Sequence, residues 1–168
     1  MTSIRRHIHA LESFLEHSGA RLSHTALPHS VHGRTYRDLI TLRDGLNPRQ
    51  ELVALVHETA HWLAHRGAHS AMHCTVFEYE AEAVEAMVLA RLGLARHIAD
   101  PAAAIEDATD NLLSASVTRA ICASDRICAA LGLKAQTPVH FQAAPRKEIV
   151  FEYEQYGMGD FFGLPEAL

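Results

Sequence analysis

The sequence predicts a single α+β domain spanning residues 1–168, mainly helical with a small twisted sheet. Apolar residues recur at helical spacing in several long stretches, and shorter stretches between them alternate or carry Pro and Gly. The chain has 168 residues, of which 48% are hydrophobic and 21% charged, which suits one globular domain with a substantial core.

The N-terminal third predicts one helix followed by extended segments. Residues 3–17 are expected to be helical and to stop at Gly19, because apolar side chains recur every three to four positions at Ile4, Ile8, Leu11 and Leu15. Residues 20–34 indicate a strand or extended loop. Tyr36–Arg43 alternates and predicts a strand that ends in a turn at residues 44–45.

The strongest helix signal starts at Asn47 and Pro48, since Asn caps free N–H groups and Pro suits the first helical position. This helix is predicted from Pro48 to about His65, with an end near Gly67. A second helix is predicted from about Thr75 to Leu92, ending near Gly93.

Residues 100–132 predict one or two further helices, broken around residues 114–116 and ending at Gly132. The remaining tail contains two strand-like pieces, Val139–Gln142 and Glu148–Tyr153, before an irregular end.

Charge and composition exclude several classes of protein. A net charge of -5 argues against a general nucleic-acid-binding surface. No signal peptide or membrane-spanning apolar run is apparent, so we expect a cytoplasmic protein. Cys74, Cys122 and Cys128 form no CxxC pair, which argues against a disulfide framework or a cysteine zinc site, and we expect them to be small buried residues.

The chemistry centres on His57-Glu-Thr-Ala-His61, an HExxH motif. Positions i and i+4 share one helix face, so His57 and His61 can hold one zinc ion. Glu58 projects to one side, where it can take a proton from a zinc-bound water as the general base. With 13 histidines such a motif can arise by chance, but its place in a capped, largely apolar helix favours a metal site.

The histidines that continue this spacing are not predicted to be ligands. A straight helix places positions i and i+8 about 12 Å apart, too far to share an ion. The metzincin class would need Gly and His where this chain has Ala64 and Gly67. We therefore interpret His65, His69 and His73 as packing or surface residues.

A third ligand is expected from the acidic start of the next predicted helix, as in the gluzincin class. Glu78 and Glu82 share a face, so one could bind zinc while the other accepts a hydrogen bond from a ligand imidazole. Glu80 and Glu85 are expected to point elsewhere. The alternative is a solvated acidic helix start.

The segments Thr41–Gln50, Leu55-Val-His-Glu-Thr-Ala-His-Trp-Leu-Ala-His65 and Glu78-Tyr-Glu-Ala-Glu-Ala-Val84 together resemble the ImmA/IrrE metallopeptidase family and the related peptidase domain of ArdC-type antirestriction proteins. The resemblance covers residues 33–94. It implies that Glu78 is the third zinc ligand and that Glu82 supports a ligand imidazole.

The same resemblance implies a zincin core, in which an edge strand beside the active-site helix binds an extended peptide, and Tyr36–Arg43 is our candidate for that strand. A donor to the oxyanion is also expected. The sequence does not choose among Tyr36, Tyr153, Tyr156 and His140.

The predicted function is that of a zinc metallo-endopeptidase, a hydrolase acting on a protein or peptide, with a helix-turn-helix repressor as the substrate that the family suggests. One alternative is an ArdC-type antirestriction protein with a vestigial peptidase site, although the segment before residue 33 is too short for the DNA-binding domain of those proteins. Another is a helical interaction protein with a structural metal or none. The sequence leaves the native metal and the oligomeric state open.

Overall fold

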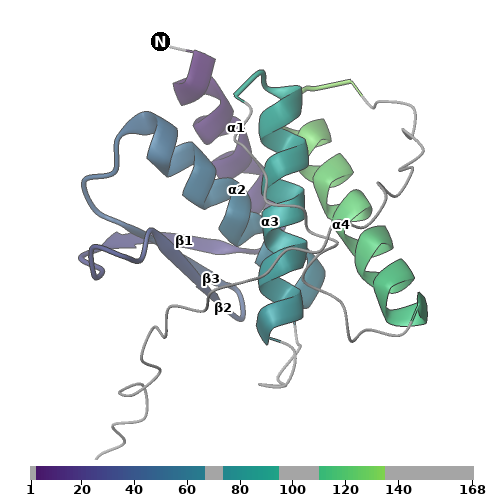
Figure 1. The fold of residues 1–168 in the computed structure, drawn as a ribbon. Helices are drawn as coiled ribbons and strands as arrows, with labels where there is room; N and C mark the ends of the chain where they lie inside the picture. Colours follow the sequence, from purple (N-terminus) through teal and green to yellow (C-terminus); the bar gives the residue numbers. More distant parts are fainter. Residues whose placement is uncertain (1–2, 67–73, 95–109, 135–168) are drawn as a thin grey trace, which may run out of the picture.

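The computed structural model describes residues 3–66, 74–94 and 110–134, and shows an α+β arrangement of four helices and a three-stranded sheet (Figure 1). The elements in chain order are α1 (Ser3–His17), β1 (Arg21–Thr25), β2 (Gly33–Tyr36), β3 (Leu39–Arg43), α2 (Pro48–His65), α3 (Cys74–Arg91) and α4 (Asp110–Ala130). The predicted helices 3–17 and 48–65 are confirmed. No helix among these described elements is both long and apolar enough to cross a bilayer.

The sheet has the order β1-β3-β2, with β1 parallel and β2 antiparallel to β3. The prediction of one strand over Tyr36–Arg43, at an edge of the sheet, is wrong both in the extent of the strand and in its position. Tyr36 ends β2, and a turn at residues 37–38, with Arg37 at a φ of 53°, separates it from β3. In the described part of the sheet β3 is the central strand and β2 an edge; three consecutive residues of β3, Ile40–Leu42, are buried, and β3 is paired with a neighbouring strand on each side.

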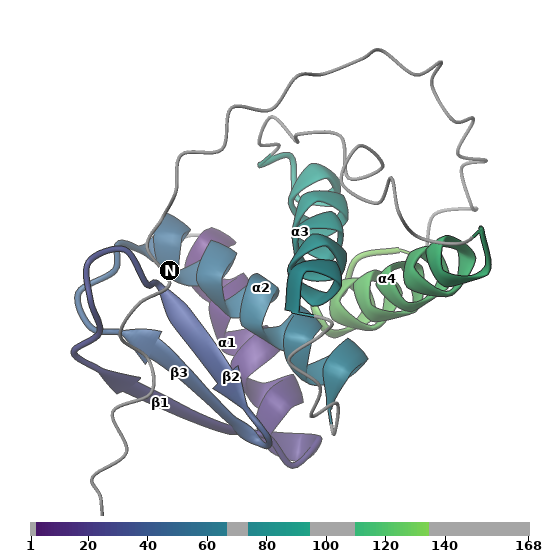
Figure 2. The ribbon, with the colours of Figure 1, turned by 60° about the horizontal axis from the view of Figure 1, so that its bottom comes forward.

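Helix α2 lies at the centre of the molecule and contacts α1, α3, α4, β2 and β3. With α1 it covers one face of the sheet, while α3 and α4 pack against its other side (Figure 2). Asn47 caps α2 by accepting bonds from the N–H groups of Arg49 and Gln50, and the Gln50 side chain accepts from the N–H of Asn47 in return. Burial on several sides of α2 explains its apolar sequence, and its core residues include Leu52, Leu55, Val56, Ala60 and Trp62.

Helix α4 runs without interruption through residues 114–116, so the predicted break is wrong. Serine can remain inside a helix when its hydroxyl finds a partner, and the buried Ser116 hydroxyl donates to Glu80 of α3. The predicted ends of α3 and α4 are confirmed, since Gly93 and Gly132 follow these helices with φ values of 67° and 71°, a conformation that favours glycine.

Several predictions fall outside the described residues: the helix end at Gly67, the segment 100–109 and the strands Val139–Gln142 and Glu148–Tyr153. The expectation that the cysteines are buried holds for Cys128 but is wrong for Cys122, which lies on the outer face of α4. Both of these thiols are free.

Candidate metal centre

Helices α2 and α3 bring together three side chains that could hold a metal ion: His57, His61 and Glu78. The Nε2 atoms of His57 and His61 lie 3.1 Å apart, as their spacing of one helical turn predicts. Helix α3 packs along α2 and places Glu78 Oε2 3.3 Å from His57 Nε2 and Glu78 Oε1 3.4 Å from His61 Nε2. The structure therefore assembles the three residues that the sequence nominated as ligands.

The separations between these atoms can be compared with those in a zinc site. Ligand atoms about 2.0–2.1 Å from a tetrahedral zinc ion lie about 3.3 Å from one another. The two Nε2 atoms lie 3.1 Å apart, and they lie 3.3 and 3.4 Å from different oxygens of the Glu78 carboxylate; with one atom taken from each residue, the three candidate ligand atoms lie within 4.8 Å of one another. Two imidazoles and one carboxylate also form a donor set that leaves a fourth position open, and the Glu78 side chain is 58% exposed, so solvent can reach this side.

The carboxylates around His57 favour a positive charge at this centre. Burial lowers the pKa of His57, but hydrogen bonds to Glu78 and Glu85 and the nearby carboxylate charges raise it, with a net value of about 10. The hydrogen bond from His57 holds the pKa of Glu78 well below its usual range. A divalent cation would satisfy the same carboxylates and leave both imidazoles neutral.

The carboxylate behind His57 is Glu85, whose Oε2 lies 3.3 Å from His57 Nδ1. The expectation that Glu85 points elsewhere is wrong, and Glu82, nominated for this support, is exposed and has no hydrogen bond or ion pair to either imidazole within the described residues. Helical geometry explains why Glu85, and not Glu82, faces His57. Glu85 follows Glu78 by two turns with an offset of about 20°, whereas Glu82 is rotated about 40° in the other direction.

The Nδ1 atom of His61 contacts the side chain of a third histidine, His65. His65 Nδ1 lies 3.2 Å from His61 Nδ1, and His65 Nε2 lies 2.8 Å from Glu80 Oε2. Of the two roles left open for His65, packing or surface, the structure shows packing, since its side chain is 8% exposed and stacks on Phe77. His69 and His73 lie outside the described residues.

Glu80 lies on the far side of His65 from the metal centre, and its side chain is 3% exposed. It accepts hydrogen bonds from Arg119 and Ser116 of α4 as well as from His65. Burial alone would raise the pKa of Glu80, but these three partners together lower it to about 2. Glu80 is therefore a buried anion with a full set of donors.

Glu58, the predicted general base, is buried and lies against β2. The Thr35 hydroxyl lies 2.7 Å from Glu58 Oε2 and donates to it, and lies 3.0 Å from the Glu58 carbonyl oxygen. Burial raises the pKa of Glu58, although the Thr35 hydrogen bond and the charges of His57 and His61 act in the opposite direction. A carboxylate with a raised pKa is a better proton acceptor near neutral pH.

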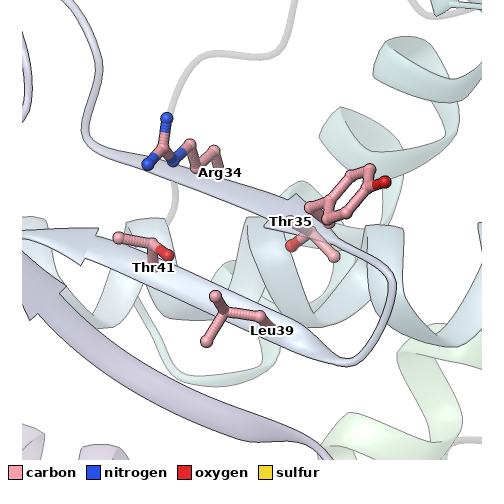
Figure 3. Close-up of a pocket in the computed structure, with 5 residues that line it drawn as sticks. Arg34, Thr35, Leu39 and Thr41 are labelled. Atoms are coloured by element: carbon pink, nitrogen blue, oxygen red, sulfur yellow. The ribbon is translucent and has the colours of Figure 1, made fainter.

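Among the oxyanion candidates, only Tyr36 lies in the described residues, and the structure does not favour it. Successive strand residues face opposite sides, so Tyr36 leaves β2 on the side opposite Thr35, and it is 67% exposed. With Arg34, Thr35, Leu39 and Thr41 it lines an open hollow of about 430 Å³ beside β2 and β3 (Figure 3). Tyr153, Tyr156 and His140 lie outside the described residues.

Sequence reasoning missed Thr35 and Glu85 and the links of His65 to His61 and Glu80. Thr35 precedes Glu58 by 23 positions on another element, so no local spacing connects them. The relation of Glu85 to Glu78 did carry a signal, the i+7 spacing of one helix face.

Comparison of the chain with protein-family models, curated proteins and solved structures found no match. The case for its function therefore rests on the residues and geometry of the metal centre.

Proposed function

We propose that this protein is a zinc-dependent metallo-endopeptidase. The observation that carries the proposal is the meeting of His57, His61 and Glu78, with the two Nε2 atoms 3.1 Å apart and each within 3.4 Å of one oxygen of the Glu78 carboxylate. Side chains this close could share one metal ion, and Glu58 follows directly after His57 on the same helix. A donor set with an open position and a neighbouring carboxylate is typical of hydrolytic zinc sites rather than structural ones.

Each residue then has a defined task. His57, His61 and Glu78 would hold the ion, which supplies Lewis acidity and lowers the pKa of a water molecule. Glu58 would be the proton carrier beside the ion, taking a proton from water and returning it to the leaving amine. Burial and the Thr35 hydrogen bond keep the Glu58 carboxylate in one place, which suits a group that must transfer protons in two directions.

Strand β2 is the element best placed to bind a substrate. It is an edge of the described sheet, and it contacts α2 next to Glu58 through Gly33 and Thr35. An extended peptide can pair with the backbone of an edge strand, which would present its carbonyl groups to the metal centre. A protein substrate, with a helix-turn-helix repressor as the first candidate, follows from the family resemblance alone.

The test combines metal analysis with a peptidase assay on wild type, Glu78→Ala, Glu58→Gln and the exposed control Glu82→Ala. We expect one zinc per chain in wild type, Glu58→Gln and Glu82→Ala, and loss of zinc in Glu78→Ala. Cleavage of an unfolded protein substrate should persist only in wild type and Glu82→Ala. A wild-type chain that takes up no zinc, or a Glu58→Gln variant that cleaves as fast as wild type, would overturn the proposal.

The antirestriction alternative predicts different behaviour in the same preparation. A chain that shifts single-stranded DNA in a gel at moderate salt and shows no peptidase activity with zinc bound would favour it. We expect no shift, because the net charge of -5 disfavours binding to a phosphate backbone.

A further inference from the structure

A row of polar side chains runs through the interior from α4 to His61. Arg119 Nε lies 3.0 Å from Glu80 Oε2, which in turn lies 2.8 Å from His65 Nε2. His65 Nδ1 then lies 3.2 Å from His61 Nδ1. The row thus crosses three helices, and its inner members are almost fully shielded: Glu80 is 3% and His65 8% exposed.

The direction of each hydrogen bond follows from the chemistry of the groups. Glu80 accepts from a guanidinium and a hydroxyl, so it acts as an ionised carboxylate, and His65 Nε2 must donate to it. One of the two facing Nδ1 atoms must donate to the other, and His65, whose Nε2 proton goes to Glu80, offers its Nδ1 as the acceptor. His61 must then carry its proton on Nδ1, which leaves His61 Nε2 bare and directed toward His57 and Glu78.

We propose that His65, Glu80 and Arg119 form a positioning chain that fixes His61 in the Nδ1–H tautomer and holds its Nε2 ready for a metal ion, a role that rests on the proposed zinc site. None of the three belongs to the proposed ligand set. This positioning chain of three side chains makes α4 part of the proposed metal centre, although α4 supplies no ligand.

With a single proton on His65, the other tautomer of His61 would leave two buried nitrogens unpaired. If the proton of His61 moved to Nε2, two bare Nδ1 atoms would face each other at 3.2 Å, and the ligand nitrogen would be blocked. Phe77 stacks on His65 and restricts its ring from turning to another partner. His57 has its own partner, Glu85, so the two ligands are oriented from opposite sides.

The first test measures zinc affinity of the full chain by competition with a chromophoric chelator. Glu80→Gln should bind zinc about 10–100-fold more weakly, because the new amide can also donate to His65 and reverse the tautomer. Arg119→Gln, changed at a residue whose side chain is 40% exposed, should fold readily and show a smaller loss in the same direction. The exposed neighbour Glu82→Gln is the matched control and should bind as wild type does.

A second pair of variants separates positioning from packing. His65→Gln keeps an acceptor for the His61 N–H, whereas His65→Leu offers none at similar volume. Zinc affinity should fall less in His65→Gln than in His65→Leu. Equal losses in the two variants would assign His65 a packing role and overturn the proposal.

The deciding measurement is the ¹⁵N spectrum of the His61 ring in the metal-free full-length protein, which distinguishes the two tautomers directly. Wild type should show Nδ1–H, and Glu80→Gln a mixture or Nε2–H. The proposed positioning role would be overturned by an Nε2–H tautomer of His61 in wild type. It would also be overturned if Glu80→Gln changed neither the His61 tautomer nor the zinc affinity. These readouts do not depend on catalysis. A wild-type protein that binds zinc but cleaves no peptide would contradict the proposed function without contradicting the positioning role of His65, Glu80 and Arg119.

Discussion

Gly33 of β2 lies directly against Glu58, so that a β-carbon placed on Gly33 would be 2.7 Å from Glu58 Cγ and 3.0 Å from Oε1. Non-bonded carbon atoms do not approach so closely, and the nearest atom, Cγ, belongs to the inner part of the buried Glu58 side chain. The absence of a side chain at position 33 therefore defines where the carboxylate of Glu58 can lie.

Gly33→Ala is expected to displace the Glu58 carboxylate and to lower kcat by about 10–100-fold, since small misplacements of a reacting group are costly. The proposed metal ligands lie on α2 and α3, so zinc content should not change. Steady-state kinetics and metal analysis check this. Arg34→Ala, a change at the neighbouring exposed position of β2, is the control, and an active Gly33→Ala enzyme would contradict the prediction.

Thr35→Val removes the 2.7 Å hydrogen bond to Glu58 Oε2 with little change of shape. That bond lowers the pKa of Glu58, so its loss should raise the pKa further. Because Glu58 must be ionised to accept a proton, the acidic limb of the kcat/KM profile should move to higher pH, while the basic limb stays in place. Thr35→Ser should restore the wild-type profile, and identical acidic limbs in all three proteins would refute the role of Thr35.

Glu85 and Glu82 form a matched pair on α3, the first 3.3 Å from His57 Nδ1 and the second exposed. Glu85→Gln should weaken zinc binding about 10–100-fold, since outer partners of ligating histidines have effects of this size. Glu82→Gln should not. Chelator competition measures both, and a larger loss in Glu82→Gln would restore the assignment made from the sequence.

Zinc affinity should rise with pH through the neutral range. In the metal-free protein the pKa of His57 is about 10, so zinc must displace a proton from this ring at all lower pH values. One displaced proton predicts a gain of about tenfold in apparent affinity for each pH unit, up to that pKa. Calorimetry in buffers of different ionisation enthalpy should show proton release, and an affinity independent of pH would contradict the protonated state of His57.

The sequence by itself determined those features that depend on neighbours along one helix. Asn47 and Pro48 begin α2 because capping involves only the first turn, and His57 and His61 share a face because a helix repeats every 3.6 residues. The same periodicity predicts the extent of α1 and the ends at Gly93 and Gly132. Glu78 was nominated from its place in a motif, and its arrival at the two histidines required α3 to pack along α2.

Only the tertiary structure decided how the elements meet. The choice of Glu85 over Glu82 depends on which face of α3 turns toward α2. The central place of β3 depends on its pairing with β1, and the unbroken α4 depends on a partner for Ser116 that lies 36 positions away. Each of these contacts joins residues from different elements, where burial and pairing outweigh local propensity, and a single sequence carries no periodicity that records them.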